Sequence, residues 1–281
     1  MTNNRVRIVT DSACDLPISV CEDLGITVVP LSIRFGEQEY TDRVELTNEQ
    51  FWTKLVAADT LPETAAPSVG AFEEAFRRLA AEGAAGVICI SLSSKMSATM
   101  QSAQVAAKAL DQLCPIEIID SKSASMGVGS LAQFAARLAN AGQGMAEISD
   151  QVRDMRERTG LLATVDTLQY LRKSGRVSSG AAMLGSVLAI KPIIGVDDGA
   201  VVAAGKVRTR SKSLQFLADH VKSLNIESLA VIHASAPDLE DFLDMLAVSV
   251  PRDQIAIGSI GPVIGVHTGP GTMGIIWTER A

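Results

Sequence analysis

The stretch "GVICISLSSKMSATMQSAQVAAKAL", residues 86–110, decides the fold class of this chain. It opens with a short apolar run, which is typical of a strand buried on both faces of a sheet. Serine and threonine residues follow, and an alanine-rich segment with helical character completes the stretch. A buried strand that leads directly into a helix is the unit from which parallel sheets are built, so the stretch predicts an α/β protein.

The same alternation of apolar strands and amphipathic helices runs through the first half of the chain. Strands are predicted at 6–10, 26–35, 86–92 and 116–121. Helices are predicted at 18–24, 46–57 and 125–142, in the second part of the segment 61–83, and in the segment that follows the strand at 86–92. "TDSACDLP" follows the first strand in place of the GxGxxG of a dinucleotide site, with Ser12 and Asp15 as helix-cap candidates. The first half is therefore predicted to be Rossmann-like without a dinucleotide fingerprint.

The pattern changes near residue 160. "KPIIGVDDGAVVAAGKV" (191–207) predicts two strands joined at an Asp-Gly turn, and further strands are expected at 228–236 and 254–269 around a helix at 237–250. A chain of 281 residues commonly forms two domains that share a cleft. We predict an N-terminal Rossmann-like parallel-sheet domain over residues 1–159 and a smaller C-terminal α+β domain over residues 160–281.

Composition narrows the class of partner. The net charge is −7 and no basic run is interleaved with aromatic residues, which argues against nucleic acid and anionic membranes as main partners. No stretch reaches the roughly 18 uninterrupted apolar residues of a membrane span, which argues against stable insertion into a membrane. Hydrophobic residues make up 47% of the chain although aromatic residues make up only 4%, so surplus aliphatic surface is available to line a cavity. The four cysteines lack CxxC spacing and the N-terminal residues lack the pattern of a secretory signal, so we expect a cytoplasmic protein with reduced thiols.

Two segments are candidates for binding an anion. Hydroxyl groups gather where the strand at 86–92 meets its helix, at Ser93, Ser94, Ser97 and Thr99, and a helix N-terminus favours negative charge. Ordinary helix capping would place the same residue types there. His267 lies in the glycine-rich, apolar stretch 257–277, where it is either a structural histidine or a group that neutralises a carboxylate at the mouth of an apolar pocket.

The order and spacing of several motifs identify the chain as resembling the DegV family of bacterial fatty-acid-binding proteins. The motifs are "VTDSACDLP", "TAAPSVGAF", "SLSSKMSATMQSA", "DSKSASMGVG", "LQYLRKSGRVSSGAAMLGSVLAIKPII", "KVRTRSKSL" and "GPVIGVHTGPGTMG". The resemblance covers essentially the whole chain. It implies a Rossmann-like domain, a second α/β domain and a buried acyl tunnel between the two.

The resemblance also implies roles for individual residues. The fatty acid carboxylate is expected to bind Thr64, His267 and a serine among Ser93, Ser94 and Ser97, while Arg176 is expected to contact a kinase subunit. The chain departs from the family pattern where TSQPS reads "TAAPS" and LSGTYQ reads "MSATMQ". These changes bear on chain-length and saturation preference, because they reshape the tunnel wall.

The expected function is that of a non-catalytic carrier. The protein would bind a long-chain fatty acid as its only ligand, without a cofactor or metal, and present the carboxylate to the catalytic subunit of a fatty acid kinase. The acyl phosphate would then pass to an acyltransferase. The alternative is a serine-dependent acyl-ester hydrolase with His267 as base and a serine of 93–97 as nucleophile, although no GxSxG elbow is present.

Overall fold

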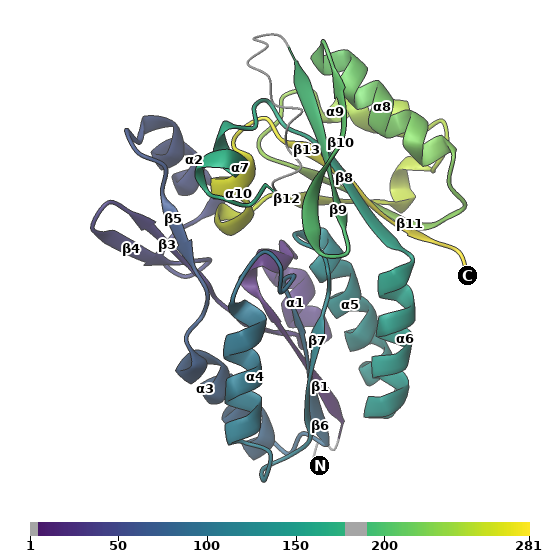
Figure 1. Ribbon diagram of the computed structural model, residues 1–281. Helices are drawn as coiled ribbons and strands as arrows, with labels where there is room; N and C mark the ends of the chain where they lie inside the picture. Colours follow the sequence, from purple (N-terminus) through teal and green to yellow (C-terminus); the bar gives the residue numbers. More distant parts are fainter. Residues whose placement is uncertain (1–4, 178–189) are drawn as a thin grey trace.

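A four-stranded parallel sheet forms the lower half of the molecule in Figure 1. The computed structural model describes residues 5–177 and 190–281. The strand order is β2–β1–β6–β7, with β2 (Thr27–Val29), β1 (Val6–Asp11), β6 (Gly86–Ser91) and β7 (Ile116–Asp120). Every residue of β6 is buried, as its continuous apolar sequence predicts for an inner parallel strand.

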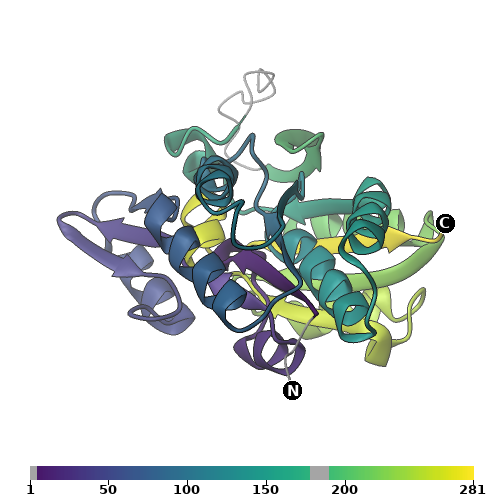
Figure 2. The ribbon, with the colours of Figure 1, turned by 90° about the horizontal axis from the view of Figure 1, so that it is seen from below.

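Helices cover both faces of this sheet, and Figures 1 and 2 show the two sets on opposite sides. One set consists of α3 (Val69–Ala81) and α4 (Thr99–Ala109), and the other of α1 (Ile18–Leu24), α5 (Met126–Asn140) and α6 (Met145–Glu157). The predicted helices are confirmed, and α3 begins where the Ser68 side chain accepts a hydrogen bond from the Ala71 amide at 3.1 Å.

The segment 26–35, predicted as one strand, is two strands. After β2 the chain turns at Pro30, which has no amide hydrogen to continue a ladder, and β3 (Ser32–Phe35) joins a different sheet. Ser12 contributes to this turn, because its hydroxyl accepts a hydrogen bond from the Leu31 amide at 3.0 Å. Neither Ser12 nor Asp15 caps α1, which makes that expectation wrong: Pro17 precedes this helix without a side-chain cap.

A small antiparallel sheet stands beside the parallel sheet in the order β4–β3–β5, where β4 is Gln38–Thr41 and β5 is Glu63–Ala65. The proline-interrupted sequence before α3 predicts a loop, and this prediction is wrong for Glu63–Ala65, which forms a strand. Its pairing with β3 sets Thr64 opposite Ile33. Between β4 and β5 lies α2 (Asn48–Ala57), whose predicted capping box between Thr47 and Gln50 is present.

A six-stranded mixed sheet forms the upper half of the molecule (Figure 1). Its strand order is β10–β9–β8–β13–β11–β12, and only β11 and β12 run parallel among these described strands. The bounds are β8 (Thr159–Thr164), β9 (Lys191–Asp197), β10 (Ala200–Val207), β11 (Ile226–His233), β12 (Ile255–Ser259) and β13 (Met273–Glu279). The predicted hairpin with its Asp-Gly turn is confirmed as β9 and β10.

Helices α8 (Arg210–Lys222) and α9 (Leu239–Leu246) pack on one face of the mixed sheet. Its other face shares one apolar core with the parallel sheet, because residues of β8, β9 and β11 cluster with residues of α5. The α/β fold expected from the sequence is thus confirmed. The mixed sheet begins at Thr159, next to the expected boundary, although the division into domains 1–159 and 160–281 stays a prediction.

The stretch 254–269, expected to be strand throughout, contains a strand and a short helix. After β12 the chain enters α10 (Pro262–Thr268), with Gly261 at the N-cap and Pro262 in the first turn. Proline suits this position because its fixed φ matches a helix and its missing N–H would have no helical partner. Pro262, Val263 and Val266 are buried. A helix that is buried on several sides has the same continuous apolar sequence as a buried strand, which explains why the sequence predicts a strand here.

Among the described helices, none is both long enough and apolar enough to cross a membrane.

Gly160→Ala is expected to destabilise the fold, by about 1–3 kcal/mol. A methyl group at Gly160 would lie 2.1 Å from the indole of Trp277, which is its partner across β8 and β13 and packs against His220. Gly144→Ala is the matched control, since a methyl group there meets nothing within 4 Å and φ is −76°. Urea unfolding followed by circular dichroism measures both, and equal stability of the two variants would contradict the packing argument.

Candidate functional site

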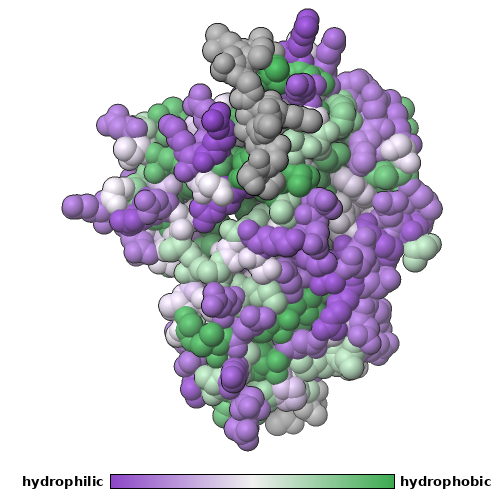
Figure 3. Space-filling view, in the orientation of Figure 1, coloured by the Kyte–Doolittle hydropathy of each residue, from purple (hydrophilic) through white to green (hydrophobic). Residues whose placement is uncertain are grey.

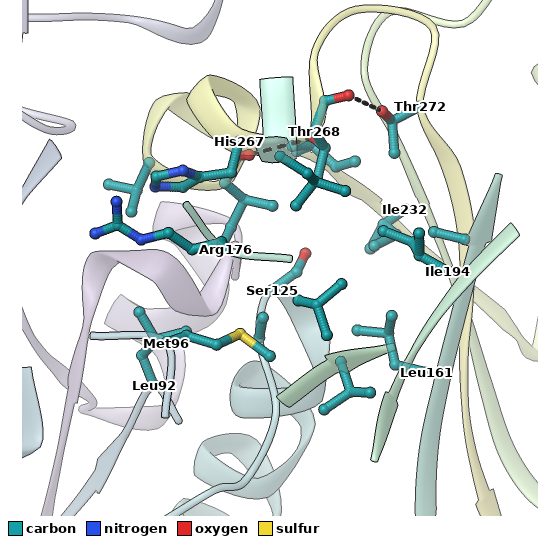
Figure 4. Close-up of a pocket in the computed structure, with 18 of the residues that line it drawn as sticks. Leu92, Met96, Ser125, Leu161, Arg176, Ile194, Ile232, His267, Thr268 and Thr272 are labelled. Atoms are coloured by element: carbon teal, nitrogen blue, oxygen red, sulfur yellow. Dashed lines mark hydrogen bonds between the residues drawn. The ribbon is translucent and has the colours of Figure 1, made fainter. Parts of the chain in front are cut away.

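A cavity lies where the carboxyl edge of the parallel sheet meets the mixed sheet. It contains about 780 Å³ of space not occupied by protein atoms, part of it open to solvent. Most side chains on its wall are apolar, and Figure 4 shows Leu161, Ile194 and Ile232 at one end of the space, from β8, β9 and β11. On the face drawn in Figure 3, hydrophobic surface lies near the centre of the molecule with hydrophilic side chains around it. The lining of the cavity therefore suits an apolar group.

The polar end of the cavity is built around His267 and Thr64. The Nε2 atom of His267 and the Oγ1 atom of Thr64 are 3.0 Å apart, although 203 positions separate the residues in the chain. Helix α10 supplies the histidine and the small sheet supplies the threonine through β5. The structure thus brings together two of the residues that the family resemblance predicted as ligands.

His267 is neutral at physiological pH. Burial lowers its pKa to about 4, and the positive charge of Arg176 adds to the effect. The Nδ1 atom is buried and has no hydrogen-bond partner among the described residues. A neutral imidazole donates from one nitrogen and accepts at the other, so His267 retains one nitrogen for a ligand in addition to its bond with Thr64.

Arg176 lines the same end of the cavity and lies beside His267 in Figure 4. The short helix α7 (Gln169–Lys173) precedes it, and its guanidinium donates a hydrogen bond from Nη1 to the Ser174 carbonyl at 2.6 Å. This end of the cavity therefore combines the permanent cation of Arg176 with the neutral side chains of Thr64 and His267. The motif that carries Arg176 continues through residues 178–189, which lie outside the described part of the chain.

The three candidate serines occupy different environments. Ser97 lines the cavity, with its hydroxyl 2.8 Å from that of Thr99. Ser93 is buried elsewhere and donates to the Gly199 carbonyl at 2.6 Å, while the Ser94 hydroxyl donates to Asp120. Only Ser97 of these three is part of the cavity wall.

The contact made by Ser93 belongs to a larger junction between the two sheets. The turn of the β9–β10 hairpin reaches the loops that follow β6 and β7. Asp198 in this turn is 2.7 Å from the Lys95 ammonium and 2.9 Å from that of Lys122. The hairpin also supplies Val196 and Val201 to the cavity wall.

Ser125 is a cavity residue that the sequence reasoning missed. It precedes α5 with φ of +53°, a backbone region that non-glycine residues seldom adopt, and its hydroxyl donates to the buried carboxylate of Asp15. The other carboxylate oxygen accepts a hydrogen bond from the Gly261 amide at 3.0 Å, at the start of α10. The hydroxyl-rich sequence after β7 was the available signal, but it does not tell which serine faces the cavity.

Burial raises the pKa of Asp15 to about 7, and the hydrogen bond from Ser125 opposes that shift. Asp15 therefore holds three chain segments together: the loop after β1, the start of α5 and the start of α10 that carries His267. Within the described residues, no group of three or more His, Cys, Asp and Glu side chains is arranged to hold a metal ion.

An apolar cavity with a polar end is typical of the class of proteins that bind small amphiphiles. The model of the family described as "Uncharacterised protein, DegV family" matches residues 5–280. The chain belongs to the DegV family, which confirms the resemblance found in the sequence.

Relatives of known sequence and structure agree in length with this chain. A DegV domain-containing protein of Halalkalibacterium halodurans is 37% identical, over 97% of this chain and 98% of its own length. Among solved structures, a DegV family protein of Thermus thermophilus described as fatty acid binding has a TM-score of 0.90 at 29% identity, covering 98% and 100% of the two chains. DegV of Bacillus subtilis, described as a fatty acid binding protein, has a TM-score of 0.85 at 30% identity, covering 99% and 100%.

We expect His267 to stay neutral until the pH falls to about 4. In the unfolded chain histidine titrates near pH 6.5, so the unfolded state gains a proton first and the fold loses stability as pH falls from about 6.5 to 4. Nitrogen-15 NMR of the imidazole in the ligand-free protein measures the midpoint directly. A midpoint close to 6.5 would contradict the buried position described above.

Proposed function

We propose that this protein binds one long-chain fatty acid, with the acyl chain in the cavity and the carboxylate at the end formed by Thr64, Ser97 and His267. The observation that carries the proposal is the hydrogen bond between Thr64 and His267 at the polar end of an apolar cavity. The solved relatives described as fatty acid binding support the same ligand class, and a relative from Eubacterium ventriosum is described as binding stearic acid.

The energetics favour such a ligand. Burying hydrocarbon gains about 0.8 kcal/mol per methylene, so a chain of about 16 carbons gains more than 10 kcal/mol before the costs of association. A carboxylate loses water on entering this site and must find hydrogen-bond donors in return. Thr64 and the neutral His267 share two protons and use one in their mutual bond, so this pair can donate one hydrogen bond to the carboxylate. The Ser97 hydroxyl is a second candidate donor, and the Arg176 cation stabilises negative charge nearby.

We further propose that the protein is a carrier rather than a catalyst, as the family resemblance implies. Arg176 lies at the polar end of the cavity and is partly exposed, which suits a residue that a kinase subunit contacts while the carboxylate is phosphorylated. An acyl phosphate hydrolyses in water, so a cavity that shields it until an acyltransferase takes it would preserve the product. Such a protein would act in the cytoplasm, where ATP is available to the partner.

The serine hydrolase alternative has less support. Ser93 and Ser94 donate their hydroxyl protons to Gly199 and Asp120, and the Nε2 atom of His267 bonds Thr64. A base that activates a serine needs to reach that hydroxyl, so this geometry does not favour either serine as nucleophile. Covalent labelling of a serine by a fluorophosphonate probe would support the serine hydrolase alternative.

Thr64→Ala, Ser97→Ala and His267→Ala should each weaken retention of oleate by about 10- to 100-fold, since a hydrogen bond to a charged group contributes about 1.5–3 kcal/mol. Isothermal titration of delipidated protein with oleate measures the loss. Ser94→Ala is the matched control, because it removes a hydroxyl from the same loop outside the cavity, and we expect it to bind as the parent does. If Ser94→Ala weakened oleate binding while Ser97→Ala left it unchanged, the assignment of Ser97 to the carboxylate site would be overturned.

Arg176→Ala should separate binding from transfer. We expect oleate to remain bound, with at most a severalfold loss, because Thr64 and His267 remain, whereas phosphorylation by a fatty acid kinase catalytic subunit with ATP and Mg²⁺ should fall at least tenfold. Native mass spectrometry measures the bound lipid and release of ADP measures the reaction. Lys191→Ala, which removes another cation of this half, is the control. Loss of binding equal to that of His267→Ala would contradict the division of roles.

A further inference from the structure

A second cavity lies beside α1 and β2, the edge strand of the parallel sheet. It contains about 860 Å³ of unoccupied space, part of it open to solvent. Helix α1 supplies Ile18 and Cys21 to its wall, and the segment after β4 supplies Asp42 and Arg43. Cys21 therefore lines a cavity that is partly open to solvent, although only 5% of the residue is exposed. Within residues 5–177 and 190–281, this cavity shares no lining residue with the candidate fatty acid site.

Cys21 has a second thiol and a cation as neighbours. Its sulfur interacts with the Cys14 thiol by a hydrogen bond, and both sulfurs face the guanidinium of Arg43. The Nη2 atom of Arg43 is 3.7 Å from the Cys14 sulfur. Arg43 is fixed in this position because it donates to the carbonyls of Leu16 at 2.9 Å and Ser12 at 3.0 Å.

The two thiols are electrostatically different. The hydrogen bond from Cys14 lowers the pKa of Cys21 to about 7, with burial opposing and Arg43 assisting, and Glu22 opposing slightly. The same hydrogen bond and burial hold the pKa of Cys14 well above its ordinary value. The pair therefore favours a thiolate at Cys21 over one at Cys14.

The other two cysteines lack these features. Burial raises the pKa of the Cys89 thiol well above its usual range, and it raises the pKa of the Cys114 thiol as well. Neither lines the second cavity. They provide internal controls for any reaction that depends on a thiolate within reach of solvent.

We propose that Cys21 and Cys14 form a peroxide-reactive thiol pair that closes to an intramolecular disulfide. The Cys21 thiolate attacks one oxygen of hydrogen peroxide and becomes a sulfenic acid, while the second oxygen leaves as hydroxide and takes up the proton released earlier by Cys21. The Cys14 sulfur then attacks the sulfenic sulfur, and the hydroxyl group leaves as water with the Cys14 proton. Two thiols are oxidised and one peroxide bond is reduced to two waters.

The experiment uses the full chain and hydrogen peroxide near stoichiometric amount at pH 7. Remaining thiols are then alkylated with N-ethylmaleimide under denaturing conditions, and the protein is digested with trypsin. Both cysteines fall in one peptide, Ile8–Arg34, so the disulfide appears as a peptide two hydrogen atoms lighter with no alkyl group. We expect this product at a rate at least about tenfold above oxidation of Cys114, since the rate follows the thiolate fraction.

Two variants divide the steps. Cys14→Ser, which keeps a hydroxyl donor beside the Cys21 sulfur, should stop the reaction at the sulfenic acid of Cys21, which dimedone traps, and Cys21→Ser should slow oxidation of Cys14 at least tenfold. Cys114→Ser is the matched control and should react as the parent does, and thermal unfolding checks that each variant is folded. Equal oxidation of all four cysteines in the unaltered chain, a disulfide between two chains as the first product, or fast oxidation of Cys21→Ser would overturn the proposal.

Discussion

The buried carboxylate of Asp15 is the interaction on which the arrangement of the cavity depends. One of its oxygens accepts from the Ser125 hydroxyl and the other from the Gly261 amide, so a single side chain joins the loop after β1 to the starts of α5 and α10. A carboxyl group in the interior is unfavourable unless its oxygens are hydrogen-bonded. These bonds fix the beginning of the short helix whose last turn carries His267, and that helix has no side-chain cap of its own.

Much of the fold follows from sequence patterns that have a local cause. The buried strand β6, the capping box of α2 and the Asp-Gly turn between β9 and β10 each depend on residues close together in the chain, and each is present as predicted. The secondary-structure predictions are wrong where contacts with distant segments decide whether a segment forms a strand or a helix. Glu63–Ala65 is a strand only because β3 lies beside it, and Pro262–Thr268 is a helix whose apolar sequence equally suits a buried strand.

The difference between local patterns and contacts of distant segments also explains which residues of the candidate site could be predicted from the sequence. Thr64, Ser97 and His267 were found through family motifs, and nothing in their spacing requires that Thr64 and His267 lie within hydrogen-bond distance. The roles of Ser93 and Ser125 were invisible, because one depends on the Gly199 carbonyl and the other on a carboxylate 110 positions earlier in the chain. Hydroxyl groups cluster at the ends of parallel strands for several reasons, and only the fold separates them.

The turn of the β9–β10 hairpin sets how the two sheets can move. Asp198 pairs with Lys95 and Lys122, and Gly199 accepts a hydrogen bond from Ser93, so the hairpin is tied at its far end to the sheet to which it does not belong. A hinge-like rotation that separated the sheets along this side would have to break all of these contacts together. The surface ion pairs weaken as ionic strength rises, whereas the buried bond to Gly199 is insulated from dissolved ions. The hairpin therefore braces the two sheets on this side, while the bonds of Thr64 and Asp15 to α10 join the two halves of the molecule elsewhere around the cavity.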